Sequence, residues 1–158
     1  MGFFEDTIRG LDEAGVRYVV VGGLAVVLHG HIRATYDLDL IVDLEEAQAR
    51  KAVDALTGLG LVPRLPLDAT ELADAAARSR WISEKFWDPA DATRSVDVFV
   101  EEPIAFEGLW ARSVVMPLAS TRVRVASIPD LIELKRGTGR PSDLADIEAL
   151  TAILEDDG

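Results

Sequence analysis

The sequence predicts a single α/β (α+β) domain, built on a small mixed β-sheet of about four or five strands with helices mainly on one face. Its 158 residues suffice for one hydrophobic core and make a second domain unexpected. Short β-branched runs alternate with stretches whose apolar residues recur at helical spacing, and glycine or proline separates them. We expect the core to cover about residues 16–127, with C-terminal helices over about 129–155.

The first 60 residues predict alternating helices and strands. The order is helix 3–14, strand 16–21, helix 24–28, strand 37–42 and helix 45–59. Gly15, Gly30 and Gly60 follow the three helical stretches, as expected of helix C-terminal caps.

The second half contains weaker signals and then two clear helices. Prolines break a strand or loop at 61–67, the alanine-rich stretch 68–80 favours a helix, and SVDVFV (95–100) alternates as a strand does. Residues 113–127 predict two short strands about a turn near Thr121. Pro129 predicts the start of one helix, and Ser142 is expected to cap the last one.

Composition excludes several classes of protein. A net charge of −12 opposes bulk nucleic-acid binding, so any RNA contact must be local. With no cysteine, neither a disulfide framework nor a thiolate metal site is possible, and a reducing cytoplasm is the expected compartment. No apolar run is long enough to span a membrane.

Three acids carry the clearest chemical signal. In a strand, residues two apart point to the same face, so Asp37 and Asp39 project side by side. Asp97, between two valines in the later strand, can reach the same face. Such carboxylates repel each other unless a cation lies between them, and magnesium prefers these oxygen ligands. Three acids on two strands are the minimum for a two-metal site that acts on phosphates.

Two glycines lie between the first strand and the short helix that follows it. The bare backbone amides of Gly22 and Gly23 could bind the outer phosphates of a triphosphate.

GGLAVVLHGHIRATYDLDLIVD (22–43), followed by the Asp97 strand, resembles the DNA polymerase β-type nucleotidyltransferase superfamily. The sequence of this stretch is most similar to that of small bacterial members, the AbiEii-type toxin nucleotidyltransferases and the minimal nucleotidyltransferases. PDLIELKRGTGRPSDLADIEAL (129–150) resembles the helix pair of that group, although Ser142 stands where a basic residue is typical.

The resemblance implies a role for each matching residue. Asp37 and Asp39 would bind two Mg²⁺ or Mn²⁺ ions, and Asp97 would assist the ion nearer the acceptor. Gly22 and Gly23 would contact the triphosphate, and Arg33 and Thr35 would line the nucleotide pocket. Lys135 would contact a phosphate or else pair with Asp143 or Asp146.

The function implied is transfer of a nucleoside monophosphate from an NTP, ATP among them, to an acceptor hydroxyl on an RNA end, a protein side chain or a small molecule, within a toxin–antitoxin system. The alternatives are a catalytically idle binding module, such as an antitoxin, and a structural domain with a decayed site. We interpret His29 and His31 as residues that cap a helix end rather than as ligands. Asp143 and Asp146 could simply place negative charge at the N-terminus of a helix, where it interacts favourably with the helix dipole.

Overall fold

A seven-stranded mixed sheet forms the centre of the computed structural model, which describes residues 2–64, 83–99, 103–136 and 140–157. The strands follow one another across the sheet in the order β3 (Val62–Pro63), β4 (Ser83–Asp88), β5 (Asp91–Phe99), β2 (Asp37–Val42), β1 (Tyr18–Val21), β7 (Thr121–Val125) and β6 (Val114–Leu118).

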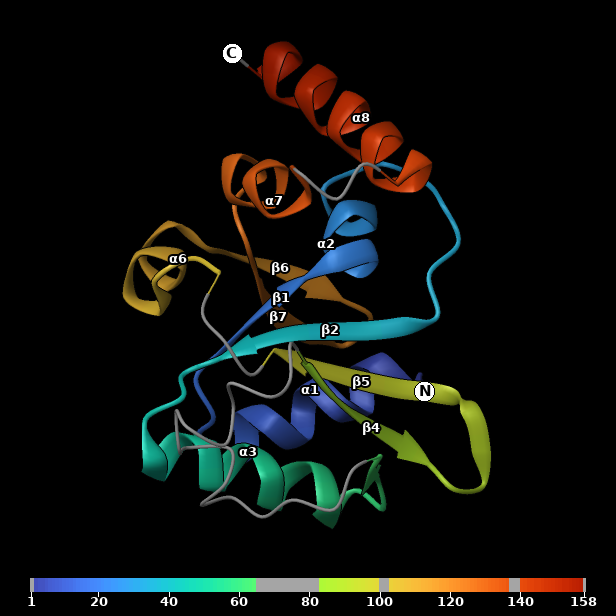
Figure 1. Ribbon diagram of the computed structural model, residues 1–158, viewed down its shortest axis with the longest axis vertical. Helices are drawn as coiled ribbons and strands as arrows, with labels where there is room; N and C mark the ends of the chain where they lie inside the picture. Colours follow the sequence, from blue (N-terminus) through green and yellow to red (C-terminus); the bar gives the residue numbers. More distant parts are fainter. Residues whose placement is uncertain (1, 65–82, 100–102, 137–139, 158) are drawn as a thin grey trace.

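Six helices lie within the described residues: α1 (Phe3–Glu13), α2 (Gly22–Leu28), α3 (Glu46–Gly58), α6 (Phe106–Arg112), α7 (Ile128–Lys135) and α8 (Pro141–Asp157). In Figure 1, α1 and α3 lie below β2, whereas α2, α7 and α8 lie above it. None of these helices is long and apolar enough to cross a membrane.

Strand β2 is the axis of the fold. It pairs antiparallel with β1 and parallel with β5. The pairing of β2 with β5 brings together, at the centre of the sheet, two segments that lie more than 50 residues apart in the sequence. Leu38, Leu40 and Val42 are fully buried on one face of β2, and the buried tyrosine and valines of β1 extend the same core. This burial fixes the strand register, because a shift of one residue would turn the apolar face to solvent.

The predicted fold class is confirmed, and so is the strand at Asp37–Val42. The sheet has seven strands rather than four or five, and β2 lies at its centre. Strand β4 and helix α6 were not predicted. In β4, SEKFWD carries charged residues on both faces, and Glu84 is buried despite its charge, so the apolar alternation that signals a strand is weak.

Two helical predictions have different outcomes. Ser142 does not cap the last helix: α8 starts at Pro141, and the Asp143 and Leu144 amides donate to the Arg140 carbonyl. Proline is favoured in a first helical turn because its missing N–H is not needed there. The predicted helix 68–80 lies outside the described residues.

Candidate active site

The three predicted acids come together where β2 pairs with β5. In the parallel register Asp39 is opposite Asp97, and Asp37 is opposite Ser95. Residues two apart on β2 share a face, so the Asp37 and Asp39 carboxylates both lie beside the β5 side chains of that face. A cluster that the sequence could only suggest is therefore produced by strand pairing.

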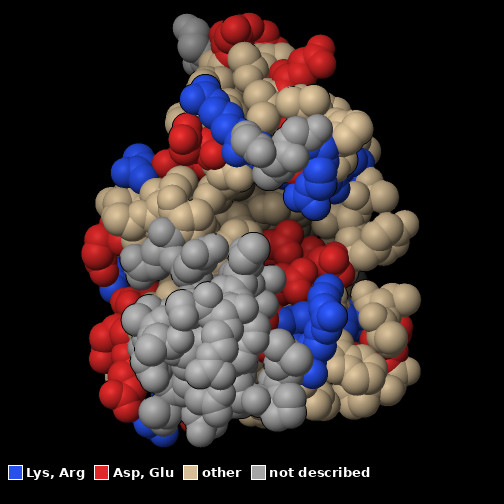
Figure 2. Space-filling view, viewed as in Figure 1, with Lys and Arg blue, Asp and Glu red and all other residues tan. Residues whose placement is uncertain are grey.

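Burial makes this cluster electrostatically strained. The pKa of Asp39 is raised to about 7, first by burial and then by the charges of Asp97 and Asp37 and a hydrogen bond with Asp97. Figure 2 shows acidic side chains gathered in a hollow at the middle of this face, with Lys and Arg side chains above and below them. The hollow thus concentrates negative charge at one point that a cation can neutralise.

Lys85 and Ser95 complete the cluster, and sequence reasoning missed both. Lys85 on β4 is opposite Asp97 in the antiparallel register, and its Nζ lies 3.4 Å from Asp97 Oδ1 and 3.9 Å from Asp37 Oδ2. The Ser95 hydroxyl donates to Asp37 Oδ1 at 2.6 Å. Alternation within SVDVFV places Ser95 on the same face as Asp97, which is a signal that could have identified it.

Gly22 allows the backbone to approach the acids closely. Its φ is +70°, and a Cβ there would lie 2.0 Å from Asp39 Oδ2, so only glycine fits. A Cβ on Gly23 would lie 2.7 Å from Thr35 Oγ1 and 2.8 Å from an Arg33 guanidinium nitrogen. The structure therefore brings the two predicted glycines together with Asp39, Thr35 and Arg33.

Lys135 lies in a buried ion-pair network of α7 and α8. Its Nζ is 3.2 Å from Asp143 Oδ1 and 3.0 Å from Asp146 Oδ2, and all three residues are buried. Arg33 Nε donates to the other Asp146 oxygen at 3.0 Å. Asp146 thereby links the loop before β2 to α7, and the two acids do more than complement a helix dipole.

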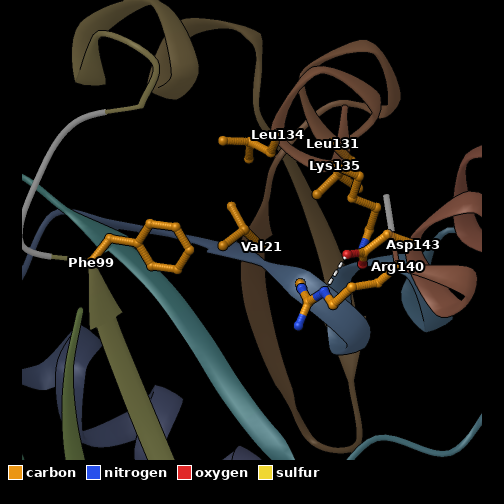
Figure 3. Close-up of a pocket in the computed structure, with 8 residues that line it drawn as sticks. Val21, Phe99, Leu131, Leu134, Lys135, Arg140 and Asp143 are labelled. Carbon is orange, nitrogen blue, oxygen red and sulfur yellow. Dashed lines mark hydrogen bonds and ion pairs between the residues drawn. The ribbon is translucent and has the colours of Figure 1, made fainter. Parts of the chain in front are cut away.

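A small pocket of about 100 Å³ separates this network from the strands, and Figure 3 shows its lining. Apolar and charged side chains both contribute: Val21, Gly22, Phe99, Leu131, Leu134, Lys135, Arg140 and Asp143. Arg140 was not among the predicted site residues, and its Nε donates to Asp143 Oδ2 at 2.8 Å. Because Gly22 also touches Asp39, the pocket adjoins the acid cluster.

The two histidines lie beside this region without joining the acid cluster. His29 Nε2 is 2.8 Å from the Ala126 carbonyl oxygen, a bond that ties the end of α2 to the segment after β7. His31 Nε2 lies 3.8 Å from Asp146 Oδ1.

The donor set suits a hard divalent cation. Carboxylate oxygens are the ligands that magnesium prefers, and the repulsion that raises the pKa of Asp39 is what such an ion relieves. In the ranges that the structure describes, no three acidic or histidine side chains are already arranged around one point as metal ligands. The Lys85 ammonium lies among these acids, within 4 Å of both Asp97 and Asp37.

The family comparison covers almost the whole chain. A family model described as a nucleotidyltransferase of unknown function (DUF6036) matches residues 5–156. No curated protein sequence matches the chain significantly.

Solved structures show where else this fold occurs. The lincomycin-bound lincosamide antibiotic adenylyltransferase LnuA is 15% identical over 96% of each chain, with a TM-score of 0.64. The antibiotic-resistance factor ANT(2'')-Ia is 14% identical over 99% of this chain and 83% of its own, with a TM-score of 0.63. An antigenic nucleotidyltransferase-like protein from Paracoccidioides brasiliensis is 13% identical over 97% and 75%, with a TM-score of 0.58. At these identities the likeness shows the fold alone.

Proposed function

The chain belongs to the DUF6036 family of nucleotidyltransferases, and we propose that it moves a nucleoside monophosphate from an NTP to a hydroxyl group of an acceptor. The observation that carries the proposal is the register of β2 and β5, which sets Asp39 opposite Asp97 with the Gly22 backbone against the Asp39 carboxylate. A fold alone does not establish an activity. Clustered acids beside a glycine turn are, however, the groups that phosphoryl transfer requires.

Asp37, Asp39 and Asp97 would hold the divalent ions, Mg²⁺ or Mn²⁺, at the point where their charges accumulate. When bound, such ions neutralise phosphate charge and polarise the reacting oxygens. The residues of the chain itself orient the nucleotide and the acceptor and accept the proton.

The transfer step has a balanced assignment. The acceptor hydroxyl oxygen forms a bond to the α-phosphorus of the NTP, the bond from that phosphorus to the bridging oxygen of the β-phosphate breaks, and pyrophosphate leaves. Asp97 accepts the hydroxyl proton, since it lies beside Asp39 and is partly exposed to an incoming acceptor. Lys85, 3.4 Å from Asp97, would hold that carboxylate in place.

The nucleotide would lie along α2 and α7. The backbone of Gly22 and Gly23 can approach the phosphates because neither residue has a Cβ, and Arg33 with Thr35 lies directly against Gly23. Lys135 supplies positive charge to the small pocket next to Gly22. Because two structures of similar fold are adenylyltransferases or antibiotic-resistance factors, ATP is the first NTP to test and a small molecule is one class of acceptor.

A specific observation favours a second candidate, a catalytically idle binding module of the antitoxin kind. The Lys85 ammonium lies where it neutralises Asp97 and Asp37, so the acids have a counter-ion without any metal. In that case the chain would act by contact with a toxin partner. Membership of the AbiEii-type group and of a toxin–antitoxin system stays a prediction.

The test is transfer of label from each α-labelled NTP, with Mg²⁺ or Mn²⁺, to host RNA, host protein and host small molecules. Wild type is compared with Asp39→Asn and with Asp54→Asn, an exposed acid on α3 that serves as the matched control. Product made by wild type and Asp54→Asn but not by Asp39→Asn supports the transferase and identifies the acceptor class. Absence of product from every NTP and every acceptor pool contradicts it.

A further inference from the structure

A larger pocket lies at the amino end of β2 and shares only Thr35 with the residues assigned to the nucleotide. It has a volume of about 370 Å³, within the range of small-molecule sites. Three segments form its walls: the start of α1, the chain just before Asp37, and β5 just before Ser95. The turn between β6 and β7 closes it with Leu118 and Ala119.

The pocket is next to the acid cluster along the chain. Tyr36 in its wall is bonded to Asp37, and Arg94 in its wall is bonded to Ser95. Those two neighbours are joined by the hydrogen bond from Ser95 to Asp37. The pocket therefore lies at the ends of β2 and β5 that carry Asp37 and Ser95.

Three aromatic side chains form part of the pocket wall. Phe3, Phe4 and Tyr36 line it, and the Tyr36 side chain remains mostly exposed although its ring is large and partly apolar. Such rings bind flat or apolar bodies and also attract organic cations through their π faces.

Glu5 adds a buried carboxylate to the same wall. The residue is 3% exposed, and its Oε1 accepts hydrogen bonds from the Arg9 guanidinium, at 2.8 Å, and from the Ser120 hydroxyl. Its other oxygen, Oε2, is buried and has no hydrogen-bond partner among the described residues. A buried acceptor without a donor is costly, so a donor bound in this pocket would be stabilised beside it.

The overall charge of the chain, rather than the pocket wall, favours a cation over an anion. Among the described residues of the wall, both charged side chains are paired, Glu5 with Arg9 at 2.8 Å and Arg94 with Asp91 at 3.4 Å, while the neighbouring Asp37 belongs to the acid cluster. The chain as a whole carries a net charge of −12, which attracts cations and repels polyanions.

We propose that this pocket binds the acceptor, and that the acceptor is a hydroxyl-bearing small molecule with an apolar body and a protonated amine. The inference rests on the proposed transferase function and names its substrate class. The amine would lie against Glu5 and the aromatic rings, which leaves the hydroxyl directed toward the acids beyond Tyr36. An RNA end is the competing acceptor.

Binding can be tested without any transfer reaction. Three probes share a phenol ring and differ in charge: tyramine (cation), N-acetyltyramine (neutral) and 4-hydroxyphenylacetate (anion). We expect tyramine to shift the backbone amide NMR signals of residues 3–5, 35–36 and 93–94 with a Kd at least about fivefold lower than that of N-acetyltyramine. The anion should bind most weakly. Equal affinities, or shifts that map elsewhere, would overturn the proposal.

Variants show whether Glu5 is the source of the preference. Glu5→Gln retains an acceptor for Arg9 and Ser120 but removes the charge, and should bring the tyramine Kd to that of N-acetyltyramine. Asp6→Asn is the matched control, because it removes an exposed acid of the same helix that does not line the pocket. Tyr36→Ala, at an exposed side chain, should weaken all three probes while leaving the fold intact.

Once label transfer has identified the acceptor, kinetics separate this inference from the proposed function. Tyr36→Ala should raise the KM for the acceptor about fivefold or more and leave the KM for the NTP unchanged. Transfer by wild type with an unchanged acceptor KM in Tyr36→Ala overturns the pocket assignment alone. Charge-selective probe binding with no transfer to any acceptor contradicts the transferase function and, with it, the acceptor role of the pocket.

Discussion

Lys85 and Asp97 face each other across the antiparallel pair of β4 and β5, with the Lys85 ammonium 3.4 Å from each Asp97 carboxylate oxygen. The same ammonium is 3.9 Å from Asp37. A single lysine therefore neutralises part of the charge that β2 and β5 bring together.

Replacing Lys85 should strengthen divalent cation binding. In Lys85→Gln the acid cluster loses the lysine ammonium that serves as its counter-ion, so Mn²⁺ no longer competes with that ammonium. Mn²⁺ should then bind about fivefold more tightly, the equivalent of roughly 1 kcal/mol for a partly exposed pair. Titration calorimetry with Mn²⁺ measures the change. Lys51→Gln, at an exposed position on α3, is the control and should leave the Kd unaltered. Weaker Mn²⁺ binding in Lys85→Gln would contradict this role.

Asp39→Asn should stabilise the metal-free protein in a pH-dependent way. The folded-state pKa of Asp39 is about 7 and its ordinary value is 3.8. Between those values the unfolded chain loses the proton while the folded chain keeps it, so the free energy of unfolding of wild type falls as pH rises. Asparagine does not titrate. Its advantage should be near zero at pH 3, grow through pH 4–7 and level off above pH 7 at roughly 2–4 kcal/mol.

Urea unfolding of both proteins in chelator across this pH range measures that advantage. Asp54→Asn should show no comparable pH dependence, since Asp54 is exposed on α3. A destabilised Asp39→Asn at pH 8 would be incompatible with strained acids.

Gly22→Ala should disrupt the site and the fold together. The φ of +70° disfavours any L side chain, and the new Cβ would lie 2.0 Å from Asp39 Oδ2 and force that carboxylate to move. We expect a loss of roughly 1–3 kcal/mol in unfolding free energy and loss of transfer activity. Gly58→Ala, at the end of α3 with nothing within 4 Å of its Cβ, should be neutral or slightly stabilising. Equal effects of the two substitutions would refute the requirement for glycine.

Asp146→Ala should destabilise the junction of α7, α8 and the loop before β2. Asp146 is 1% exposed and accepts from Arg33, while the buried Lys135 lies 3.0 Å away. Truncation leaves the Lys135 charge less compensated, a loss of about 3–5 kcal/mol for a buried pair. Chemical denaturation tests it against Asp156→Ala, an exposed acid on the same helix, which should change stability little. A small effect at Asp146 would show that Asp143 alone satisfies Lys135.

Local patterns predicted the elements whose apolar periodicity is strong. The strand at Asp37–Val42, the helices near both termini and the glycine that ends α1 are found where expected, because burial on one face dictates these patterns. The prediction of a nucleotidyltransferase is confirmed, because the DUF6036 family model matches residues 5–156 and the solved structures share the fold. The metal ligands and nucleotide contacts remain predictions, although the structure places the residues concerned close together.

Long-range pairing decided what local patterns could not. Strand β4 has charges on both faces, and its identity depends on the neighbours that it pairs with in the sheet. Lys85 entered the site only through that pairing, whereas alternation within SVDVFV could have identified Ser95 and the register of β2 with β5 placed it opposite Asp37. The pocket near Glu5 joins segments from four parts of the chain, so no single stretch of sequence signals it.

By itself the sequence determined the fold class, the spacing of the acids and the glycine turn, because each depends on the φ/ψ preferences and side-chain periodicity of a few adjacent residues. The tertiary structure alone decided the charge balance of the site. Strand register set Asp97 against Asp39 and Lys85 against Asp97, and burial raised the pKa of Asp39. Coulombic interaction and desolvation depend on distances between residues remote in sequence, which only the folded chain fixes.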